Sequence, residues 1–352
     1  MSLKKSPAEQ GHDESAVRQP PRELERGPWK GMGRRLTTAL GSSGGILLAA
    51  IALTIFFSLT QPSFLTSENA SGILRTTTAL LIAALGMTFV MIAGAFDLSV
   101  GSMSALAGVI LVMALSAGLP APLAILATLV ACSLIALIAN GLPIGFLAFN
   151  FFVVTLATLS IFRGAALLIS NGQSADTSSW PLVQYLGDGK LGPVPVPIAV
   201  VVVVYVLGFA VLKWSRFGRM VFAVGGNPEA AWLAGIDVRR VRAGVFALSG
   251  GLAALAGVLL VGRLTSSQPV TGGIGLELAA ASAVLLGGTS FAGGSGSVWG
   301  TAVGCIFIGV LQNGLTLSGV PTFWQAVATG AILFLALTFE RFRGRLARGL
   351  KA

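Results

Sequence analysis

Charged residues are scarce in this 352-residue chain, where Asp, Glu, Lys and Arg make up 10% and apolar residues 54%. Because a soluble domain carries roughly a quarter charged residues, this composition excludes a water-soluble enzyme. The chain has only two cysteines and one histidine, which excludes a disulfide scaffold and a clustered metal site. A mean hydropathy of +0.85 instead indicates a protein that crosses a membrane several times, since helices satisfy their own backbone hydrogen bonds in lipid.

Nucleotide-binding motifs are also missing from the chain. The glycine-rich run at 287–297 is followed by no lysine and lies between two apolar segments, so it does not fit a phosphate-binding loop. We predict that this run is a flexible or closely packed connection, and that the chain binds neither a cofactor nor a metal. Cys132 and Cys305 lie inside apolar runs and are expected to be buried, while glycines such as Gly250 and Gly257 should let helices approach closely.

The formal net charge is +10, but the basic residues form three clusters along the chain rather than a nucleic-acid-binding patch. Clusters in the N-terminal tail, a central loop and the C-terminal tail are typical of cytoplasmic flanks under the positive-inside rule. Residues 1–36 are polar and are expected to form a disordered cytoplasmic tail with no cleavable signal peptide. The other two clusters comprise Lys213, Arg216, Arg219, Arg239, Arg240 and Arg242, and Arg341, Arg343, Arg345 and Arg348.

Apolar runs of about 17–25 residues predict about ten membrane-spanning helices, and therefore an all-α polytopic membrane protein. An even number of crossings places both termini and the central basic loop, residues 213–242, in the cytoplasm, and makes 171–195 the longest loop on the other side. We expect a transmembrane domain at 37–339, between the N-terminal tail and a basic cytoplasmic tail at 340–352. The predicted spans lie near 38–60, 73–95, 103–118, 121–140, 151–170, 196–212, 243–262, 276–290, 298–318 and 321–339.

A weak internal similarity relates two parts of the chain. The triplet Asn-Gly-Leu occurs at 140–142 and again at 313–315, and the pair Gly-Ser stands beside the start of a predicted span at 101–102 and at 296–297. Transporters are often built from duplicated halves with the solute pathway between them. Short matches also arise by chance in apolar sequence, so both interpretations stay open.

Polar side chains inside the predicted spans are candidates for a solute pathway. A carboxylate at membrane depth normally pairs, faces water or marks a pathway, although Asp97 and Ser99 would also suit the N-terminal cap of the next helix. Amide and hydroxyl groups suit an uncharged polyhydroxylated solute, but interhelical hydrogen bonds would explain each of them equally. Arg163 either snorkels or pairs with Asp97 or Glu277. The candidate pathway residues are Asp97, Ser99, Asn140, Thr155, Thr158, Asn313 and Gln325.

The central loop contains a sequence that predicts a short helix of about two turns. Asn227 suits the N-cap, Pro228 the first helical position, Glu229 the positive end of the helix dipole, and Gly235 the C-terminal stop. An apolar helix this short needs a partner surface, or else lies on the bilayer as an interfacial helix. Its apolar residues are Ala230, Ala231, Trp232 and Leu233.

Seven runs spread through roughly residues 70–338 act together as a family signature. They are 86–102, 155–164, 171–173, 216–219, 224–227, 235–238 and 287–300. In their order and residues these runs resemble the permease subunits of ribose/xylose-type bacterial ABC sugar importers. Only the N-terminal tail and the first predicted span fall outside the resemblance.

The resemblance implies a multi-pass permease subunit of the inner membrane that imports a monosaccharide, such as ribose or xylose, by alternating access and catalyses no reaction itself. It implies three protein partners: a periplasmic sugar-binding protein, a second permease copy, with a homodimer as the simpler default, and a cytoplasmic ATP-binding cassette subunit that uses ATP and Mg. Membrane lipid is expected to surround the chain, and nucleic acid is not a partner. The resemblance also makes the central loop the element that couples to the ATPase, through Asn227, Glu229, Ala230, Gly235 and Asp237.

Two other classes of function compete with this interpretation. A secondary transporter driven by an ion gradient needs titratable groups at membrane depth, for which Asp97, Glu277 and Arg163 are the candidates. It would also leave the cytoplasmic helix without a purpose. A membrane-embedded acyl or glycosyl transferase would need a cluster of acidic residues and histidine, yet His12 lies in the N-terminal tail. Which sugar is carried stays open.

Overall fold

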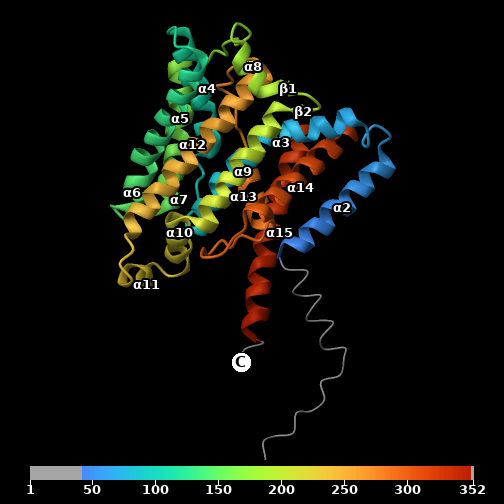
Figure 1. The fold of residues 1–352 in the computed structure, drawn as a ribbon. Coiled ribbons are helices and arrows are strands. Elements are labelled where there is room, and N and C mark those ends of the chain that lie inside the picture. Colours follow the sequence, from blue (N-terminus) through green and yellow to red (C-terminus); the bar gives the residue numbers. More distant parts are fainter. Residues whose placement is uncertain (1–41, 350–352) are drawn as a thin grey trace, which may run out of the picture. The chain divides into compact units, whose positions relative to one another are not determined.

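The computed structural model describes residues 42–349, which form a bundle of helices with one short antiparallel hairpin, β1 (Lys190–Leu191) and β2 (Val194–Pro195) (Figure 1). This confirms the predicted all-α class. The tail expected at 1–36 lies outside the described residues, as do residues 350–352.

The helices follow one another along the chain with short connections. Their bounds are α2 (Ser42–Thr60), α3 (Ser67–Ile92), α4 (Val100–Ser116), α5 (Ala121–Ala136), a π-helical turn η1 (Leu137–Gly141), α6 (Leu142–Gly145), α7 (Phe151–Ser170), α8 (Pro181–Asp188), α9 (Val196–Trp214), α10 (Arg216–Gly226), α11 (Pro228–Leu233), α12 (Val238–Leu264), α13 (Leu276–Leu286), α14 (Val298–Leu317) and α15 (Thr322–Gly349).

Every apolar segment predicted to span the membrane contains a helix. By length and composition, six stretches are able to cross a membrane: α3, α5 through α6, α7, α9, α12 and α14. Shorter apolar helices occupy 44–60, 100–116, 276–286 and 322–338. The helix α13 ends at Leu286, before the predicted boundary at 290, and α15 continues into the predicted tail as far as Gly349. The number of crossings therefore stays a prediction.

The helix α12 runs through the middle of the bundle, where it packs against α3, α4, α5 and α8 (Figure 1). Its side chain Phe246 is fully buried, as is Phe89 of α3. Glycines allow the close approach that the sequence predicts: Gly250 faces the α5 backbone and Gly257 faces the α4 backbone. Both cysteines are buried and free, as expected.

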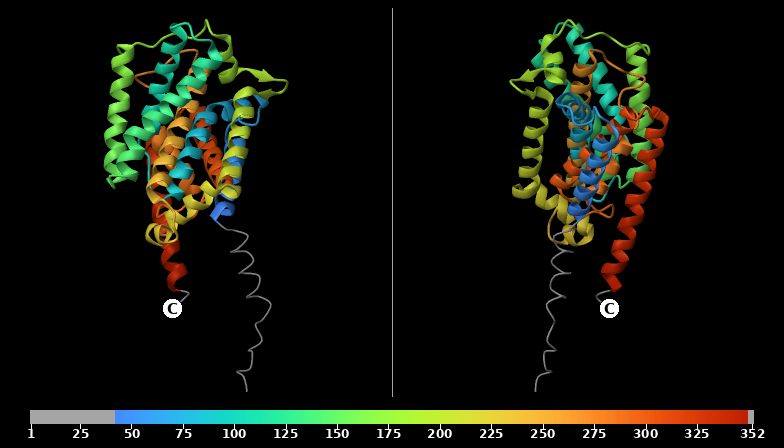
Figure 2. Two further views of the ribbon diagram at one scale, coloured as in Figure 1. Left: turned by 60° about the vertical axis from the view of Figure 1, so that its left-hand side comes forward. Right: turned by 90° about the vertical axis from the view of Figure 1, so that its right-hand side faces the viewer.

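The two ends of the bundle carry different structures. The helices α10 and α11 lie at one end, from which the last turns of α15 project, and α8 lies with the hairpin at the other (Figure 2). We call these the α11 end and the α8 end. At the α8 end, Arg75 of α3 forms an ion pair with Asp188. In the loop before α8, the Ser178 hydroxyl and the Ser178 backbone N–H donate hydrogen bonds to the exposed Asp176 carboxyl. These bonds hold the pKa of Asp176 below its usual value.

We expect Gly250→Ala to lose about 1–3 kcal/mol of stability, because overpacking a filled interior forces the neighbouring helices apart. The added Cβ would lie 2.9 Å from the Cys132 carbonyl oxygen and would also meet the Ala136 methyl group. Gly164→Ala on α7 is the matched control, since open space surrounds that glycine. The apparent melting temperature in detergent should fall for Gly250→Ala alone. Equal melting temperatures for the two variants would contradict the close α5–α12 contact.

Candidate functional site

A buried carboxylate occupies the non-helical turn between α3 and α4. Asp97 Oδ1 accepts hydrogen bonds from the Ser99 backbone N–H (3.0 Å) and hydroxyl (2.6 Å), and Oδ2 accepts from the Ser249 hydroxyl of α12 (2.8 Å). Asp97 is 2% exposed. Ser99 stands at the N-cap of α4, but the predicted cap is wrong for its side chain, which bonds no amide of that helix because its hydroxyl is committed to Asp97.

Two further predicted residues extend this arrangement across the bundle. Asn140, in the π-helical turn η1, donates through Nδ2 to the Ser99 hydroxyl (2.9 Å), and its Oδ1 accepts from the Thr158 hydroxyl of α7 (2.7 Å). All five members of this Asp97 network, Asp97, Ser99, Asn140, Thr158 and Ser249, are buried. The network therefore ties the α3–α4 turn to α12, η1 and α7 through complete hydrogen bonding of its polar atoms.

The other three predicted pathway residues lie outside the network. Thr155 is buried one turn from Thr158, but its hydroxyl donates to the Phe151 carbonyl within α7. Asn313 of α14 exchanges two hydrogen bonds with Asn69 of α3 (2.8 and 3.0 Å). Gln325 donates to the Thr316 hydroxyl across the α14–α15 turn (3.1 Å). Their place in a solute pathway stays a prediction.

Ser249 was missed by sequence reasoning. Its partner Asp97 lies 152 positions away in the chain, and a single serine in an apolar helix gives no local signal of such a contact.

The basic residue at depth does not pair with a carboxylate. The two ion pairs between described residues are Arg75–Asp188 and Arg240–Asp237. Of the two alternatives for Arg163, an ion pair with Asp97 or Glu277 is therefore not formed, although the charge of Glu277 still acts on Arg163 from beyond ion-pair distance. Arg163 instead donates through Nη1 to the backbone carbonyls of Gly272 (2.8 Å) and Pro269 (3.1 Å). A guanidinium has five donors in a fixed fork, which suits the irregular backbone between α12 and α13.

The short helix predicted in the central loop is confirmed as α11, and its cytoplasmic location stays a prediction. The Asn227 side chain accepts hydrogen bonds from the Glu229 and Ala230 backbone N–H groups, both at 3.0 Å. Gly235 ends the helix in the left-handed region (φ +83°), where a glycine carries no Cβ strain. Asp237 then caps α12 by accepting from the Arg240 backbone N–H (3.1 Å). Asn227 therefore begins α11 and Gly235 ends it, as predicted, and Asp237 begins α12.

Most of α11 presents its side chains to the surroundings. Ala231 is buried, whereas Trp232 and Leu233 are 69% and 79% exposed. A cavity of about 900 Å³ adjoins the helix, lined also by Gly145 of α6 and by Arg242 of α12. The exposed apolar side chains therefore lie beside a hollow whose lining includes Glu229, Asp237, Arg239 and Arg242 at the α11 end.

Glycines bring α10, the helix that precedes α11, against the turn that holds Asp97. The Gly294 N–H donates to the Ile92 carbonyl at the end of α3 (2.9 Å). An added Cβ at Gly225 would meet that carbonyl and would lie 2.7 Å from the Gly294 nitrogen. Gly293, at φ +87°, lies against Gly94 in the same way. Of the two alternatives for the run at 287–297, the closely packed connection is therefore correct, and we call this contact the glycine junction.

Within the described residues, no three His, Cys, Asp or Glu side chains converge so that they could hold a metal ion. Both oxygens of the Asp97 carboxylate accept hydrogen bonds from hydroxyl or backbone amide donors. The network therefore holds helices together.

Residues 69–337 match the family described as "Branched-chain amino acid transport system / permease component". The chain is 36% identical over 300 residues to the ribose import permease protein RbsC of Haemophilus influenzae, across 84% of this chain and 92% of that protein. It is 37% identical over 307 residues to the L-arabinose ABC transporter permease protein AraH of Azospirillum brasilense, across 87% and 90%. It is 33% identical over 306 residues to the D-allose transport system permease protein AlsC of Escherichia coli, across 85% and 91%. No solved structure matches the chain.

The Asp97 network makes a prediction about two threonines on α7. Thr158→Val removes the one hydroxyl among the described residues that donates to the Asn140 Oδ1 atom, and a buried acceptor left unpaired costs about 1–3 kcal/mol. Thr155→Val has the same change of shape one turn away, but it removes only a bond within α7. We expect the melting temperature in detergent to fall clearly for Thr158→Val and little for Thr155→Val. The reverse order would show that the network does not hold α7.

Proposed function

The chain belongs to the family of branched-chain amino acid transport system permease components, and from this premise we propose how it transports its solute. It is the membrane-spanning permease subunit of an ABC importer for a monosaccharide. The observation that carries this function is the match along most of the chain to proteins named as permeases for ribose, L-arabinose and D-allose. The resemblance to ribose/xylose-type permeases is thereby confirmed.

We propose that α11 docks on a separate ATP-binding subunit. Exposed Trp232 and Leu233 give the helix an apolar surface, and fixed caps at Asn227 and Gly235 hold its length and direction. An ATPase surface would cover these side chains, which the bundle leaves uncovered. In this arrangement ATP and Mg bind to the partner, and the permease binds no cofactor of its own.

We propose that the chain crosses the membrane ten times, with both termini in the cytoplasm. The six long apolar helices and four shorter ones supply the crossings, and the basic residues around α10 and the start of α12 support a cytoplasmic α11 end. The helix α13 has 11 residues and spans only about 16 Å. It would therefore cross together with the non-helical segment at 265–275.

The α8 end then faces the sugar-binding protein, with the loop 171–195 on the accessible surface. A homodimer is the simplest assembly that gives the two ATP-binding subunits equivalent docking helices. We also propose that the chain has two related halves, because Asn140 and Asn313 each hold a neighbouring helix. Asn140 accepts a hydrogen bond from a hydroxyl of α7, and Asn313 forms paired amide hydrogen bonds with α3.

Alternating access provides the mechanism. ATP binding and hydrolysis in the partner would move α11, and the glycine junction would pass that movement to Ile92 and the Asp97 turn. The helices α4, α7 and α12 meet at this turn through the Asp97 network, so they would shift together. The permease forms and breaks no covalent bond. We disfavour transport driven by an ion gradient, because it would explain neither the family match nor the exposed side chains of α11.

Substitution of an exposed leucine in α11 tests this function. We expect Leu233→Asp to lower ATP-dependent sugar uptake into proteoliposomes at least tenfold and to reduce co-purification of the ATP-binding subunit, since a charge would enter the apolar contact. Leu191→Asp in β1 is the matched control, because Leu191 is also exposed (63%) but lies at the α8 end. That variant should retain the ATP-binding subunit.

The uptake assay contains the sugar-binding protein, with ATP enclosed in the vesicles. Uptake that follows an ion gradient, without ATP or the ATP-binding subunit, would refute the importer function. Normal ATPase binding by Leu233→Asp would refute only the docking role of α11.

A further inference from the structure

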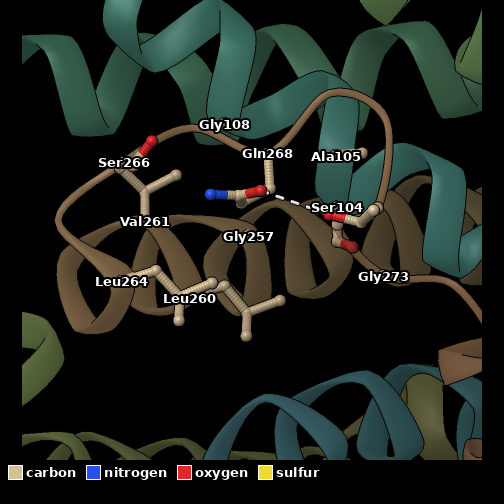
Figure 3. Close-up of a pocket in the computed structure, with 12 residues that line it drawn as sticks. Ser104, Ala105, Gly108, Gly257, Leu260, Val261, Leu264, Ser266, Gln268 and Gly273 are labelled. Carbon is tan, nitrogen blue, oxygen red and sulfur yellow. Dashed lines mark hydrogen bonds between the residues drawn. The ribbon is translucent and has the colours of Figure 1, made fainter. Parts of the chain in front are cut away.

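A second polar feature lies apart from the Asp97 network, at the opposite part of α12. A cavity of about 350 Å³ opens between α4, α12 and the segment 265–275 (Figure 3). The α12 residues that line it, from Gly257 to Leu264, form the last turns of that helix. Since α12 begins beside α11, the cavity belongs to the α8 end, which receives solute in the proposed importer.

The segment 265–275 is irregular backbone, which crosses the membrane together with α13 in the arrangement that we propose. Such backbone is tolerated in a membrane protein where it is buried in protein or lines a cavity. Here Arg163 of α7 binds three of its carbonyls, and the Ser267 N–H donates to the Ala175 carbonyl in the loop after α7 (2.9 Å). Gly273, at φ +68°, lies directly against the start of α4. The segment is thus fixed from three sides.

A second cavity, of about 220 Å³, lies on the other face of the same segment. Gly273 and Leu260 line both cavities, so little more than the thickness of this segment separates them. The polar residues Thr76 and Gln312 line the second cavity. A modest displacement of the segment would join the two spaces along the direction of transport.

The lining of the larger cavity defines the solute that fits it. Its polar side chains are Ser104, Ser266, Gln268 and Thr271, and none of its lining residues is charged. Hydroxyl and amide groups between glycine and leucine walls suit an uncharged molecule with many hydroxyl groups. The volume falls within the range of about 300–1,000 Å³ usual for small-molecule sites.

Gln268 is the side chain best placed to meet such a molecule. It lies between the α4 backbone at Gly108 and the α12 backbone at Gly257 (Figure 3). Its Oε1 accepts a hydrogen bond from the Thr271 hydroxyl (3.2 Å), whereas its Nε2 group donates to no other described residue. The amide therefore keeps two donors for a solute.

We propose that this cavity is a monosaccharide-binding site within each permease subunit, and that Gln268 forms hydrogen bonds with the sugar hydroxyls there. The proposal rests on the proposed function, since it assumes that a monosaccharide passes through the chain. Few contacts and neutral groups fit a site from which the solute must also leave.

Thiol labelling tests the site directly. The native cysteines are buried, so Gln268→Cys introduces the reactive thiol in the assembled complex. We expect millimolar D-ribose, L-arabinose or D-allose, whichever the complex imports, to slow methanethiosulfonate labelling of Gln268→Cys at least threefold. Gln184→Cys, at a half-buried glutamine of α8 outside the cavity, is the matched control and should be labelled at the same rate with or without sugar.

Uptake by Gln268→Met supplies the second measurement, because methionine has a similar length without hydrogen-bonding groups. We expect the maximal rate of ATP-dependent uptake to fall at least fivefold while the ATP-binding subunit stays bound. If Gln268 variants fail to assemble, protection of Ser266→Cys in the same cavity decides instead.

The outcomes separate this proposal from the function on which it rests. Normal uptake by Gln268→Met together with unprotected thiols at both positions overturns the site and leaves the importer function standing. Absence of ATP-dependent sugar uptake by the unaltered complex would overturn the function itself.

Discussion

The buried Asp97 carboxylate sets the constraint on which the arrangement of the helices depends. With no cation within ion-pair distance among the described residues, its two oxygens must be satisfied by hydroxyl and backbone donors from the turn itself and from α12. The Ser99 hydroxyl also accepts from Asn140, which in turn holds Thr158. Satisfying one buried carboxyl group in a low-dielectric interior thus fixes four elements relative to one another.

The glycine junction connects this fixed interior to the α11 end. Where a Cβ at Gly225 would collide with the Ile92 carbonyl, the backbones of α10 and α3 touch directly. Direct backbone contact would transmit a displacement without depending on side-chain rotamers, which suits the coupling role that we propose for α11. At the α8 end the segment 265–275, bound by Arg163, separates two polar cavities. In the importer that we propose, one end of α12 lies beside the docking helix and the other beside the solute cavity.

The features that follow local rules could be predicted from the sequence. Apolar runs located the helices, and Asn227, Pro228 and Gly235 located α11, because caps act on residues two to four positions away. Features that depend on contacts between residues far apart in the sequence could not be predicted. Ser249 and Gln268 are ordinary residues until folding brings them beside Asp97 and α4, while Asn313 and Gln325 bind neighbours outside the network. Arg163 binds backbone carbonyls rather than a carboxylate. This contact could not be predicted, because no local motif encodes the irregular backbone beside Arg163.

The amount of sugar imported per ATP hydrolysed tests the central claim most directly, with Gly225→Ala compared against Gly226→Ala in the reconstituted complex. A Cβ at Gly225 would separate α10 from the Ile92 carbonyl, whereas open space surrounds Gly226. The account predicts that Gly225→Ala keeps hydrolysing ATP but imports several-fold less sugar per ATP, while Gly226→Ala keeps the ratio of the unaltered protein. An unchanged ratio in a folded Gly225→Ala complex would contradict transmission through the glycine junction.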